Sequence, residues 1–370
     1  MKLSISTQDL NYGLNIVTRA ISPRAVKNIY NGVHISAQPE KTVLTCTDGD
    51  MSIQAEIPAI VEVPGEAVLP GKFLYDLARY QTGDMVLIEA KDSGRVRVVS
   101  GASSSNLMGM DPDEFPEIYE IEKSASVFVP CARYKDALGS VLFAVSNDES
   151  RKILTGVLTE IYPGEIITVG LDGFRMAMRR IAREQFGDEK DKIAFVVPGR
   201  CVSEIAKILP DDEKAEMEMR LADNRIEYIF DNVKVFSTLL NGEFIDYQRI
   251  LPKTWTTQIK TSTEAFDRSV ERCSLMAREG KNNLIYFKIN NDGTLEMKSS
   301  AEKGEVRDEI VIQFEGNELE IAFNSKYLLD VIKNINTEQV CMCFNSKVSP
   351  CMVIPPEGND YLFLVLPVRV

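Results

Sequence analysis

Histidine is nearly absent from the sequence, which contains one among 370 residues. That residue, His34, lies in a strand-like run and is expected to be structural. Its isolation argues against zinc sites and against catalysis that relies on a histidine base. The seven cysteines include no CxxC pair, and most lie within apolar runs, which is typical of buried free thiols in a reducing compartment. Cys341 and Cys343 alternate on one face of a probable strand, so a metal site there stays open.

Long hydrophobic runs are missing as well. No apolar run approaches the roughly 18 residues needed to span a membrane, and the segment MKLSISTQDL has no signal-peptide pattern. We therefore expect no membrane association and a cytoplasmic location. The chain also lacks Pro/Gly/Ser-rich linkers and low-complexity tracts, so its domains are expected to pack rigidly. Its 370 residues suffice for two or three domains with ample cores.

Basic residues are in deficit, with 42 Lys and Arg against 55 Asp and Glu and a net charge of −13 at pH 7. Such acidity argues against a general nucleic-acid-binding surface, because phosphate contacts require basic side chains. Net charge is a sum, however, and a polyanion responds to the local distribution of charge. An acidic exterior with a basic inner lining would repel nonspecific partners and accept a duplex in one place.

Three stretches repeat one amphipathic helix, at 68–81, 196–209 and 322–335. The fifth position of each stretch is basic, and the intervals between these positions are 128 and 126 residues: Lys72, Arg200 and Lys326. The twelfth position is basic too: Arg79, Lys207 and Lys333. Seven residues make about two turns, so each basic pair falls within roughly 20° on one face. The opposite face is apolar (Phe73 and Leu74 in the first copy), so each helix buries one side and offers two cations on the other.

The repeat extends over the whole chain. Each copy opens with an amphipathic helix, at 6–21, 130–146 and 262–277. Strand pairs follow at 41–57, 165–181 and 294–312, the first two around an Asp-Gly hairpin signal. Further strands come after the basic helices, at 84–101, 215–240 and 339–356. This order predicts an α+β fold of three tandem copies of a helix/antiparallel-sheet module, with domains 1–122, 123–250 and 251–370.

Helices on the concave side of an arc would turn the basic residues inward. A single arc covers only part of a turn, so closing it into a ring requires a second chain in head-to-tail contact. The sequence thus predicts a ring-shaped homodimer with a basic lining.

Four segments resemble one known family: DGFRMA (172–177), GEFIDYQRILPK (242–253), FNSKYLLDVIK (323–333) and LPVRV (366–370). With the threefold module, their order and spacing resemble the β subunit of bacterial DNA polymerase III, the sliding clamps, over the whole chain in one register. The resemblance implies the DNA-clamp fold and a head-to-tail homodimer that encircles double-stranded DNA without sequence preference. It implies a processivity factor for DNA replication that tethers the polymerase, without catalytic activity, cofactor or metal.

The resemblance also implies site residues. Together with the repeated helices it assigns DNA binding to eight cations: Arg24, Lys72, Arg79, Lys152, Arg200, Lys207, Lys326 and Lys333. It implies that the polymerase III alpha subunit, the clamp loader, other polymerases and repair proteins insert short peptides into a hydrophobic pocket. The implied pocket positions are Leu154, Leu171, Gly173, Phe174, Arg175, Met176, Ile245, Arg249, Ile250, Asn324, Tyr327, Val348, Pro350, Leu364, Leu366, Pro367, Val368 and Arg369. At the implied dimer seam, Leu107 in a Ser-rich strand faces Leu275 and Met276.

Four positions depart from the commoner family pattern. Phe174 stands where many relatives have histidine, and Ile245 where many have proline. Lys152 and Ile153 replace aromatic residues near the DNA path. These departures leave the pocket in place, but they bear on peptide preference and on the DNA contacts of that loop.

Two other functions are open to the sequence. In an enzyme, Asp48, Asp50 and Asp172 would serve as magnesium or acid/base carboxylates. Asp-Gly in a hairpin needs only turn chemistry, however, and the third copy lacks it. In a scaffold that binds only proteins, the basic faces would be solvated, but six matched charges in three copies argue against that.

Overall fold

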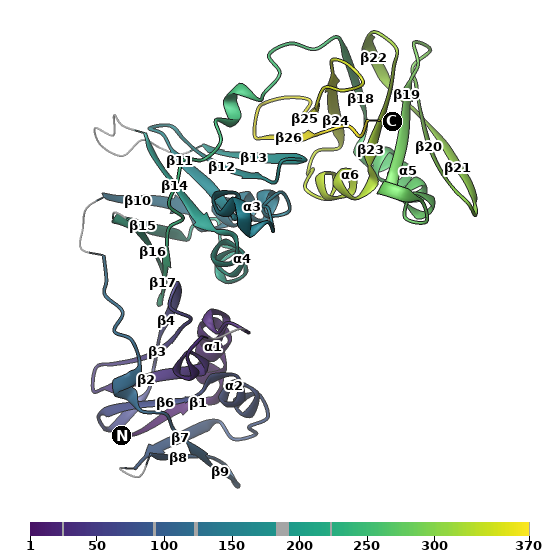
Figure 1. The fold of residues 1–370 in the computed structure, drawn as a ribbon. Coiled ribbons are helices and arrows are strands. Elements are labelled where there is room, and N and C mark those ends of the chain that lie inside the picture. Colours follow the sequence, from purple (N-terminus) through teal and green to yellow (C-terminus); the bar gives the residue numbers. More distant parts are fainter. Residues whose placement is uncertain (24–25, 92–93, 122–124, 183–191, 223, 370) are drawn as a thin grey trace. The chain divides into compact units, whose positions relative to one another are not determined.

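A computed structural model describes residues 1–23, 26–91, 94–121, 125–182, 192–222 and 224–369 (Figure 1). The chain divides into two compact units, each an assembly of antiparallel sheets and helices. The first unit comprises Met1–Lys135 and Ser203–Leu239, and the second comprises Asp136–Val202 and Leu240–Val370.

The three copies follow one order of elements, except that the described part of the second has no counterpart of the short strands β5 and β22. The first contains β1 (Lys2–Ser6), α1 (Thr7–Val17), β2 (Gly32–Gln38), β3 (Lys41–Thr47), β4 (Met51–Ile57), β5 (Ile60–Val63), β6 (Gly65–Pro70), α2 (Gly71–Arg79), β7 (Met85–Ala90), β8 (Arg95–Ser100) and β9 (Ser103–Met108). The second contains β10 (Ala125–Pro130), α3 (Cys131–Leu142), β11 (Gly156–Ile161), β12 (Glu165–Leu171), β13 (Arg175–Ala182), β14 (Ile193–Pro198), α4 (Gly199–Ile208), β15 (Glu216–Ala222), β16 (Arg225–Phe230) and β17 (Val233–Thr238). The third contains β18 (Thr257–Ser262), α5 (Thr263–Ala277), β19 (Leu284–Ile289), β20 (Thr294–Ala301), β21 (Gly304–Val311), β22 (Gln313–Gly316), β23 (Leu319–Asn324), α6 (Ser325–Ile332), β24 (Gln339–Phe344), β25 (Cys351–Ile354) and β26 (Tyr361–Val365).

The predicted order of helix, strands, helix and strands is confirmed in each copy, but each copy also opens with a short strand that the sequence pattern did not reveal: β1, β10 and β18. The start of the basic helices was predicted three residues too early. The first three residues of each repeated stretch end β6, β14 and β23. Branched residues and a terminal Pro70 or Pro198 suit the end of a strand better than the inside of a helix.

Four sheets organise the two units. The first unit holds a five-stranded sheet, β5-β1-β7-β8-β9, and an eight-stranded sheet, β10-β15-β16-β17-β4-β3-β2-β6. The second holds a nine-stranded sheet, β14-β11-β12-β13-β26-β25-β24-β18-β22, and a four-stranded sheet, β21-β20-β19-β23. The large sheets confirm the expected continuity between copies, because strands of neighbouring copies pair within them. The units do not coincide with single copies, because the middle copy contributes β10 and β15–β17 to a sheet of the first unit and β11–β14 to a sheet of the second.

Helices cover the sheets through apolar faces. In the first unit α1 packs on β3, β4 and α2, and in the second α5 packs on β19, β20, β21 and α6 (Figure 1). Gly13 permits the close approach of α1, since a Cβ atom there would lie 2.9 Å from Leu44 Cδ1. All seven cysteines are buried and free, as predicted.

Glu227 of β16 is an acidic group inside the first unit, with no exposed surface. Its Oε2 accepts a hydrogen bond of 3.1 Å from the Ile121 backbone N–H, while Oε1 has no hydrogen-bond partner among the residues that the structure describes. Arg220 Nη1 lies 3.9 Å from Glu227 Oε2, and Arg220 Nη2 forms a shorter ion pair of 2.8 Å with Glu218 Oε2. Burial is the main cause that raises the pKa of Glu227 above its ordinary value.

We expect Glu227→Gln to become more stable relative to the parent protein as the pH rises from about 4 to about 8. A raised folded-state pKa means that the folded protein holds this proton more tightly than the unfolded chain does. The parent therefore loses stability as the pH rises through this pKa, whereas the amide keeps an acceptor for Ile121 and carries no charge. Urea unfolding across this pH range measures the difference, and a constant difference would contradict the expectation.

Candidate functional site

The six predicted cations of the repeated helices are all exposed: Lys72 and Arg79 on α2, Arg200 and Lys207 on α4, and Lys326 on α6 with Lys333 as its C-cap. The buried faces are apolar as predicted, with Leu74, Ile205 and Leu328 all at 3% exposure or less. Phe73 was wrongly predicted to be buried. Its ring is 55% exposed, because it follows Lys72 on the outer side of the helix.

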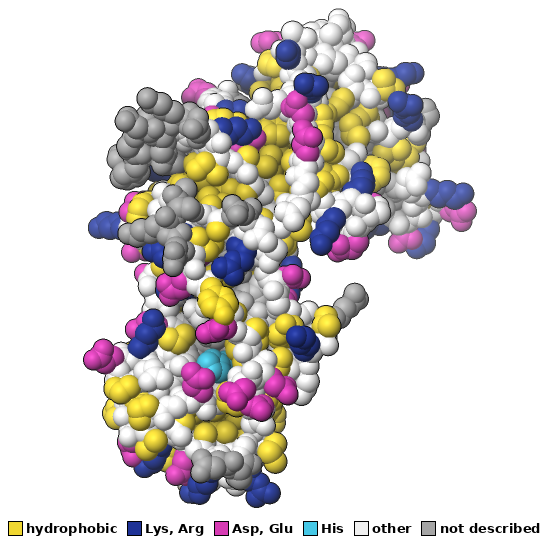
Figure 2. All heavy atoms as spheres, turned by 60° about the vertical axis from the view of Figure 1, so that its left-hand side comes forward, with side chains coloured by type: hydrophobic (Ala, Val, Ile, Leu, Met, Phe, Trp, Pro, Cys, Tyr) yellow, Lys and Arg dark blue, Asp and Glu magenta, His cyan; other side chains and the backbone are white. Residues whose placement is uncertain are grey.

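Four of these cations are available to a ligand. Lys72, Arg79, Lys326 and Lys333 form no ion pair with any residue that the structure describes. Lys207 is paired, since its Nζ lies 2.8 Å from Glu204 Oε1 of the same helix. On the face shown in Figure 2, basic and acidic side chains are intermixed, so the net charge of −13 does not describe every part of the surface.

Two further predicted DNA-binding residues lie outside these helices. Arg24 is outside the described residues. Lys152 is exposed in the 3₁₀ segment Glu149–Thr155, and its carbonyl accepts a hydrogen bond of 2.7 Å from Thr155 Oγ1. The neighbouring Ile153 packs against the core of the second unit.

The predicted pocket residues all belong to the second unit, and two apolar groups can be distinguished among them. Four are buried to 6% exposure or less within one apolar cluster: Leu154, Leu171, Met176 and Leu364. Five large apolar side chains are exposed by 38% to 55%: Phe174, Ile245, Ile250, Val348 and Leu366. The buried group supports the surface, and the exposed group offers apolar area to a partner.

Phe174 and Leu366 are brought together by the sheet. β13 pairs with β26, with Met176 opposite Leu364, and the Leu366 N–H then donates to the Phe174 carbonyl at 2.9 Å. The Phe174 ring stacks on Tyr327 of α6, with centroids 6.0 Å apart and planes at 26°. Residues from three distant segments thus form one apolar surface.

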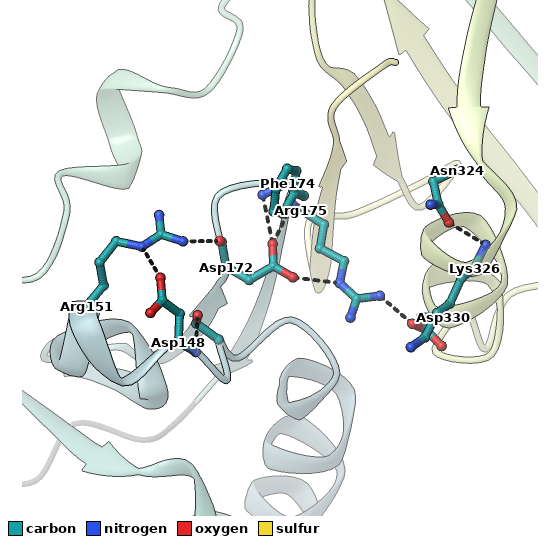
Figure 3. A network of polar contacts seen from close by, with 9 residues as sticks. Asp148, Arg151, Asp172, Phe174, Arg175, Asn324, Lys326 and Asp330 are labelled. Atoms are coloured by element: carbon teal, nitrogen blue, oxygen red, sulfur yellow. Dashed lines mark hydrogen bonds and ion pairs between the residues drawn. The ribbon is translucent and has the colours of Figure 1, made fainter. Parts of the chain in front are cut away.

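Asp172 shapes the turn that presents Phe174 (Figure 3). Its Oδ1 accepts the N–H groups of Phe174 at 2.8 Å and Arg175 at 2.9 Å. Gly173 occupies the left-handed region at φ 93°, which strongly favours glycine. Arg151 donates to the Asp172 carbonyl at 3.3 Å and holds the turn from its other side.

Arg175 connects this turn to α6 (Figure 3). Its Nε lies 3.1 Å from Asp172 Oδ2, and its Nη1 bonds to Asp330. Its guanidinium also lies 4.7 Å from the centroid of the Tyr327 ring and is 10% exposed. Burial, and next the charge of Asp172, raise the pKa of Tyr327. Asn324 caps the same helix by accepting the Lys326 N–H at 2.9 Å.

A second network holds the segment that carries Ile245 and Ile250. The Tyr247 hydroxyl between them donates to buried Glu160 of β11 at 2.6 Å, and Tyr162 donates to the same carboxylate at 3.2 Å. Burial, followed by this hydrogen bond, raises the pKa of Tyr247. Nothing in the sequence pattern pointed to Glu160, whereas Asp330 could have been suspected from its position one turn after Tyr327.

The predicted seam residues lie at sheet edges. Leu107 is half-buried on β9, the edge strand of the five-stranded sheet. Leu275, 65% exposed, and Met276 lie on α5 beside β21, the edge strand of the four-stranded sheet.

The aspartates considered for catalysis lie in hairpin turns. Asp48 Oδ1 accepts the N–H groups of Asp50 at 3.1 Å and Met51 at 2.9 Å, as Asp172 does in its own hairpin. Within the described ranges, no three His, Cys, Asp or Glu side chains gather as a metal site would require. Cys341 and Cys343 lie inside the apolar cluster of the second unit.

His34, cyan in Figure 2, has contacts that suit the expected structural role. Its Nε2 lies 3.2 Å from Glu66, and its ring stacks on Phe115 with centroids 5.0 Å apart. None of the helices in the described parts of the chain combines the length and apolarity that crossing a lipid bilayer demands.

We expect Arg175→Lys to destabilise the protein by about 1–3 kcal/mol. A lysine cannot reach both Asp172 and Asp330 in a fork, so one half-buried carboxylate loses its partner. Arg268→Lys is the matched control, because Arg268 is 67% exposed and its pair with Glu264 should contribute less than about 1 kcal/mol. Calorimetric unfolding tests both, and equal effects would show that the Arg175 network contributes no more than a surface ion pair.

Comparison with known proteins identifies the family. The sequence models of the DNA polymerase III beta subunit match in order: the N-terminal domain at residues 1–119, the central domain at 129–246 and the C-terminal domain at 248–369. The beta sliding clamps of Staphylococcus epidermidis and Staphylococcus aureus are 32% identical over 365 and 366 residues, covering 96% of each chain. The crystal structure of the Bacillus subtilis DNA polymerase sliding clamp matches with a TM-score of 0.96 and 30% identity, covering 100% of this chain and 99% of that one. A putative DNA polymerase III beta subunit from Eubacterium rectale matches with a TM-score of 0.95 and 26% identity, covering 100% of both chains. The chain therefore belongs to the DNA polymerase III beta subunit family, the sliding clamps, which are processivity factors of replication and not catalytic enzymes.

Proposed function

We propose that two copies of this protein close head to tail into a ring that encircles duplex DNA and tethers the replicative polymerase in the cytoplasm. One observation carries the proposal. Equivalent strands join successive copies of the module, and among the described residues the two strands that would make a third such join, β9 and β21, lie at sheet edges.

The two internal joins use the same strands of the module. The last strand of the second copy, β17, pairs with β4 of the first copy, with Val235 opposite Ile53. The last strand of the third copy, β26, pairs in the same antiparallel way with β13 of the second copy. The strands β4, β13 and β21 occupy equivalent positions in the three copies. Each internal join pairs β4 or β13 with the last strand of the following copy. The strand β21 and the last strand of the first copy, β9, therefore remain at sheet edges. An edge strand of this kind is ready to pair with another chain.

The two free strands are complementary in their pattern of burial. Leu107 and Ser105 of β9, and Val306 and Asp308 of β21, are half-buried, and their neighbours along each strand are exposed. If Met108 lies opposite Glu305, the half-buried residues of the two strands face one another, with Ser105 opposite Asp308. Leu107 then meets Val306 beside Leu275 and Met276.

Charge favours the same pairing. A cavity of about 550 Å³ beside β9 is lined by the cations Lys91, Arg95 and Arg97 together with Asn106, Leu107 and Met108. On the opposing strand, the exposed positions include Glu305 and Glu309. Opposite charges on facing edges select the head-to-tail arrangement over pairing of identical edges.

We expect Ser104→Cys with Glu309→Cys to yield a disulfide-linked dimer under mild oxidation. The proposed register places these two residues opposite each other on the exposed face, where cross-strand Cβ atoms are about 4.5–5.5 Å apart. Background should be low, because all seven native cysteines are buried. Non-reducing electrophoresis measures the linkage.

The register control is Ser104→Cys with Val311→Cys, which moves one thiol two residues along the strand. It should cross-link much less, and so should either single variant. Equal linkage in both double variants would reject the register, and a solution mass of one chain at all concentrations would reject the ring.

The basic helices suit a ring that slides on DNA. Lysine and arginine on helix surfaces hold phosphates without reading bases, so contacts stay exchangeable along the duplex. We assign this role to Lys72, Arg79, Arg200, Lys207, Lys326 and Lys333, and to Arg24 and Lys152 as additional contacts. Topology then prevents dissociation, and the acidic remainder of the protein discourages nonspecific binding.

The apolar surface of the second unit is proposed to receive peptides from partner proteins. Phe174, Tyr327 and Leu366 form a contiguous surface for Leu or Phe anchors, and Ile245 and Ile250 lie on the segment that Tyr247 fixes. The partners proposed are the polymerase III alpha subunit, the clamp loader, other polymerases and repair proteins. We also propose 1–122, 123–250 and 251–370 as the clamp domains, which the matched family ranges support.

We expect combined charge reversal at Lys72, Arg200 and Lys326 to weaken retention on closed circular DNA and to flatten its salt dependence. Each lost phosphate contact should reduce the slope of log K against log salt by about 1. Retention of the loaded protein on circular DNA, before and after linearisation, provides the measurement. Partner-peptide binding should be unchanged.

Deletion of 366–370 is the reciprocal control. It removes Leu366 from the apolar surface, so peptide binding should fall while retention on circular DNA persists. Loss of both activities in both variants, with folding intact by circular dichroism, would contradict two separate sites. Equal retention on circular and linear DNA would favour ordinary surface binding.

A further inference from the structure

The second unit contains a groove that extends beyond the apolar surface of Phe174, Tyr327 and Leu366. The groove has a volume of about 730 Å³ and runs over the outer face of the four-stranded sheet, on β20, β19 and β23. Its other wall comprises Lys347 and Val348 together with the tail residues Val368 and Arg369. The volume falls within the range of about 300–1,000 Å³ that is typical of ligand sites.

The floor of the groove contains an aromatic ring. Tyr286 of β19 is 38% exposed and lies between Lys298 of β20 and Ala322 of β23 in the sheet register. Its chain neighbours Ile285 and Phe287 point to the opposite, buried face. With Val348 and Val368 in the wall, the groove presents apolar area at its centre.

The charges around this apolar centre do not cancel. Lys298 pairs with Glu305 at 2.7 Å, and Glu296 pairs with Arg307 at 2.5 Å, both on the β21 side. Among the residues described by the structure, three lining cations and one lining carboxylate have no ion-pair partner: Lys288, Lys347, Arg369 and Glu320. The groove is therefore locally basic in a protein with a net charge of −13.

The groove is continuous with the proposed peptide surface. Val348, Val368 and Arg369 belong to both, and the Val368 N–H donates to the Ala322 carbonyl of β23 at 2.8 Å. The backbone of the tail thus forms the border between them. A chain that leaves the Phe174–Leu366 surface along the tail enters the groove.

We propose that this groove binds an acidic segment, with an aromatic or apolar residue over Tyr286, that flanks the anchor residues of a partner peptide. The inference rests on the proposed peptide-binding function and extends it to a second contact region. A peptide fits better than a nucleic acid. Glu320 and Glu296 would repel a phosphate backbone, whereas Glu320 can accept N–H groups of a peptide.

The experiment compares three fluorescent peptides on the full-length protein. Each contains the same Leu and Phe anchors and differs only in its extension: Glu-Glu-Tyr-Glu, Ser-Ser-Tyr-Ser or Lys-Lys-Tyr-Lys, placed at either terminus. Two or three exposed ion pairs of about 0.2–1 kcal/mol each predict about tenfold tighter binding of the acidic peptide than of the serine peptide. The lysine peptide should bind more weakly than the serine peptide.

Single charge reversals locate the effect. Lys288→Glu and Lys347→Glu should each reduce the gain from the acidic extension by about threefold or more and leave the serine peptide unchanged. Lys214→Glu is the matched control, because Lys214 is exposed and outside the groove, and it should preserve the gain.

The outcomes separate this inference from the proposed function. If the serine peptide binds but the acidic extension adds nothing, or its gain survives both reversals, the groove proposal is overturned while the peptide surface stands. If no peptide binds, the proposed function fails first and the groove proposal with it. Displacement of the acidic extension by an oligothymidylate, with anchor binding intact, would assign the groove to nucleic acid and overturn the peptide proposal.

Discussion

Strand pairing across the repeat boundaries determines both the sheet architecture and the candidate site. A ladder between β17 and β4, and another between β13 and β26, turn three small modules into two large sheets. Backbone hydrogen bonds at these joins fix the register to single residues, because a slip by one would turn apolar side chains to solvent. The second join also determines the candidate site, since it brings the tail to the Phe174 turn.

Arg175 fixes the geometry of the surface at the second join. Its guanidinium bonds carboxylates from a hairpin and from a helix, and it lies over the Tyr327 ring that stacks on Phe174. A planar fork with several donors can satisfy these partners together, which an ammonium group cannot do. The exposed rings are thereby held in place before any partner arrives, which reduces the entropy lost on binding.

Local sequence patterns predicted much of this fold, but they did not reveal contacts between residues that are far apart in the chain. Helical spacing predicted the exposed cations, and Asp-Gly predicted the hairpins, since both signals lie within a few residues of one another. The opening strands β1, β10 and β18 have only five or six residues and run directly into helices, so the alternation in β1 and β18 is too short to separate them from the helices that follow. Family resemblance assigned Phe174 and Tyr327 to one pocket, but the support from Asp330 and Glu160 depends on contacts between residues far apart in the chain. Phe73 shows the limit of periodicity, because an aromatic residue at the edge of an apolar face can turn outward.

The serine-rich composition of β9 has a consequence for how such a ring would open. The internal joins pair Val235 with Ile53 and Leu364 with Met176, whereas β9 offers Leu107 and Met108 after three serines and an asparagine. In the proposed ring, β9 (SSSNLM) would bring fewer large apolar side chains to its join than β17 (VKVFST) and β26 (YLFLV) bring to theirs. We therefore expect the intermolecular join to separate before either internal one. Such opening requires no hinge within either chain, only an intermolecular join that is weaker than the equivalent internal joins.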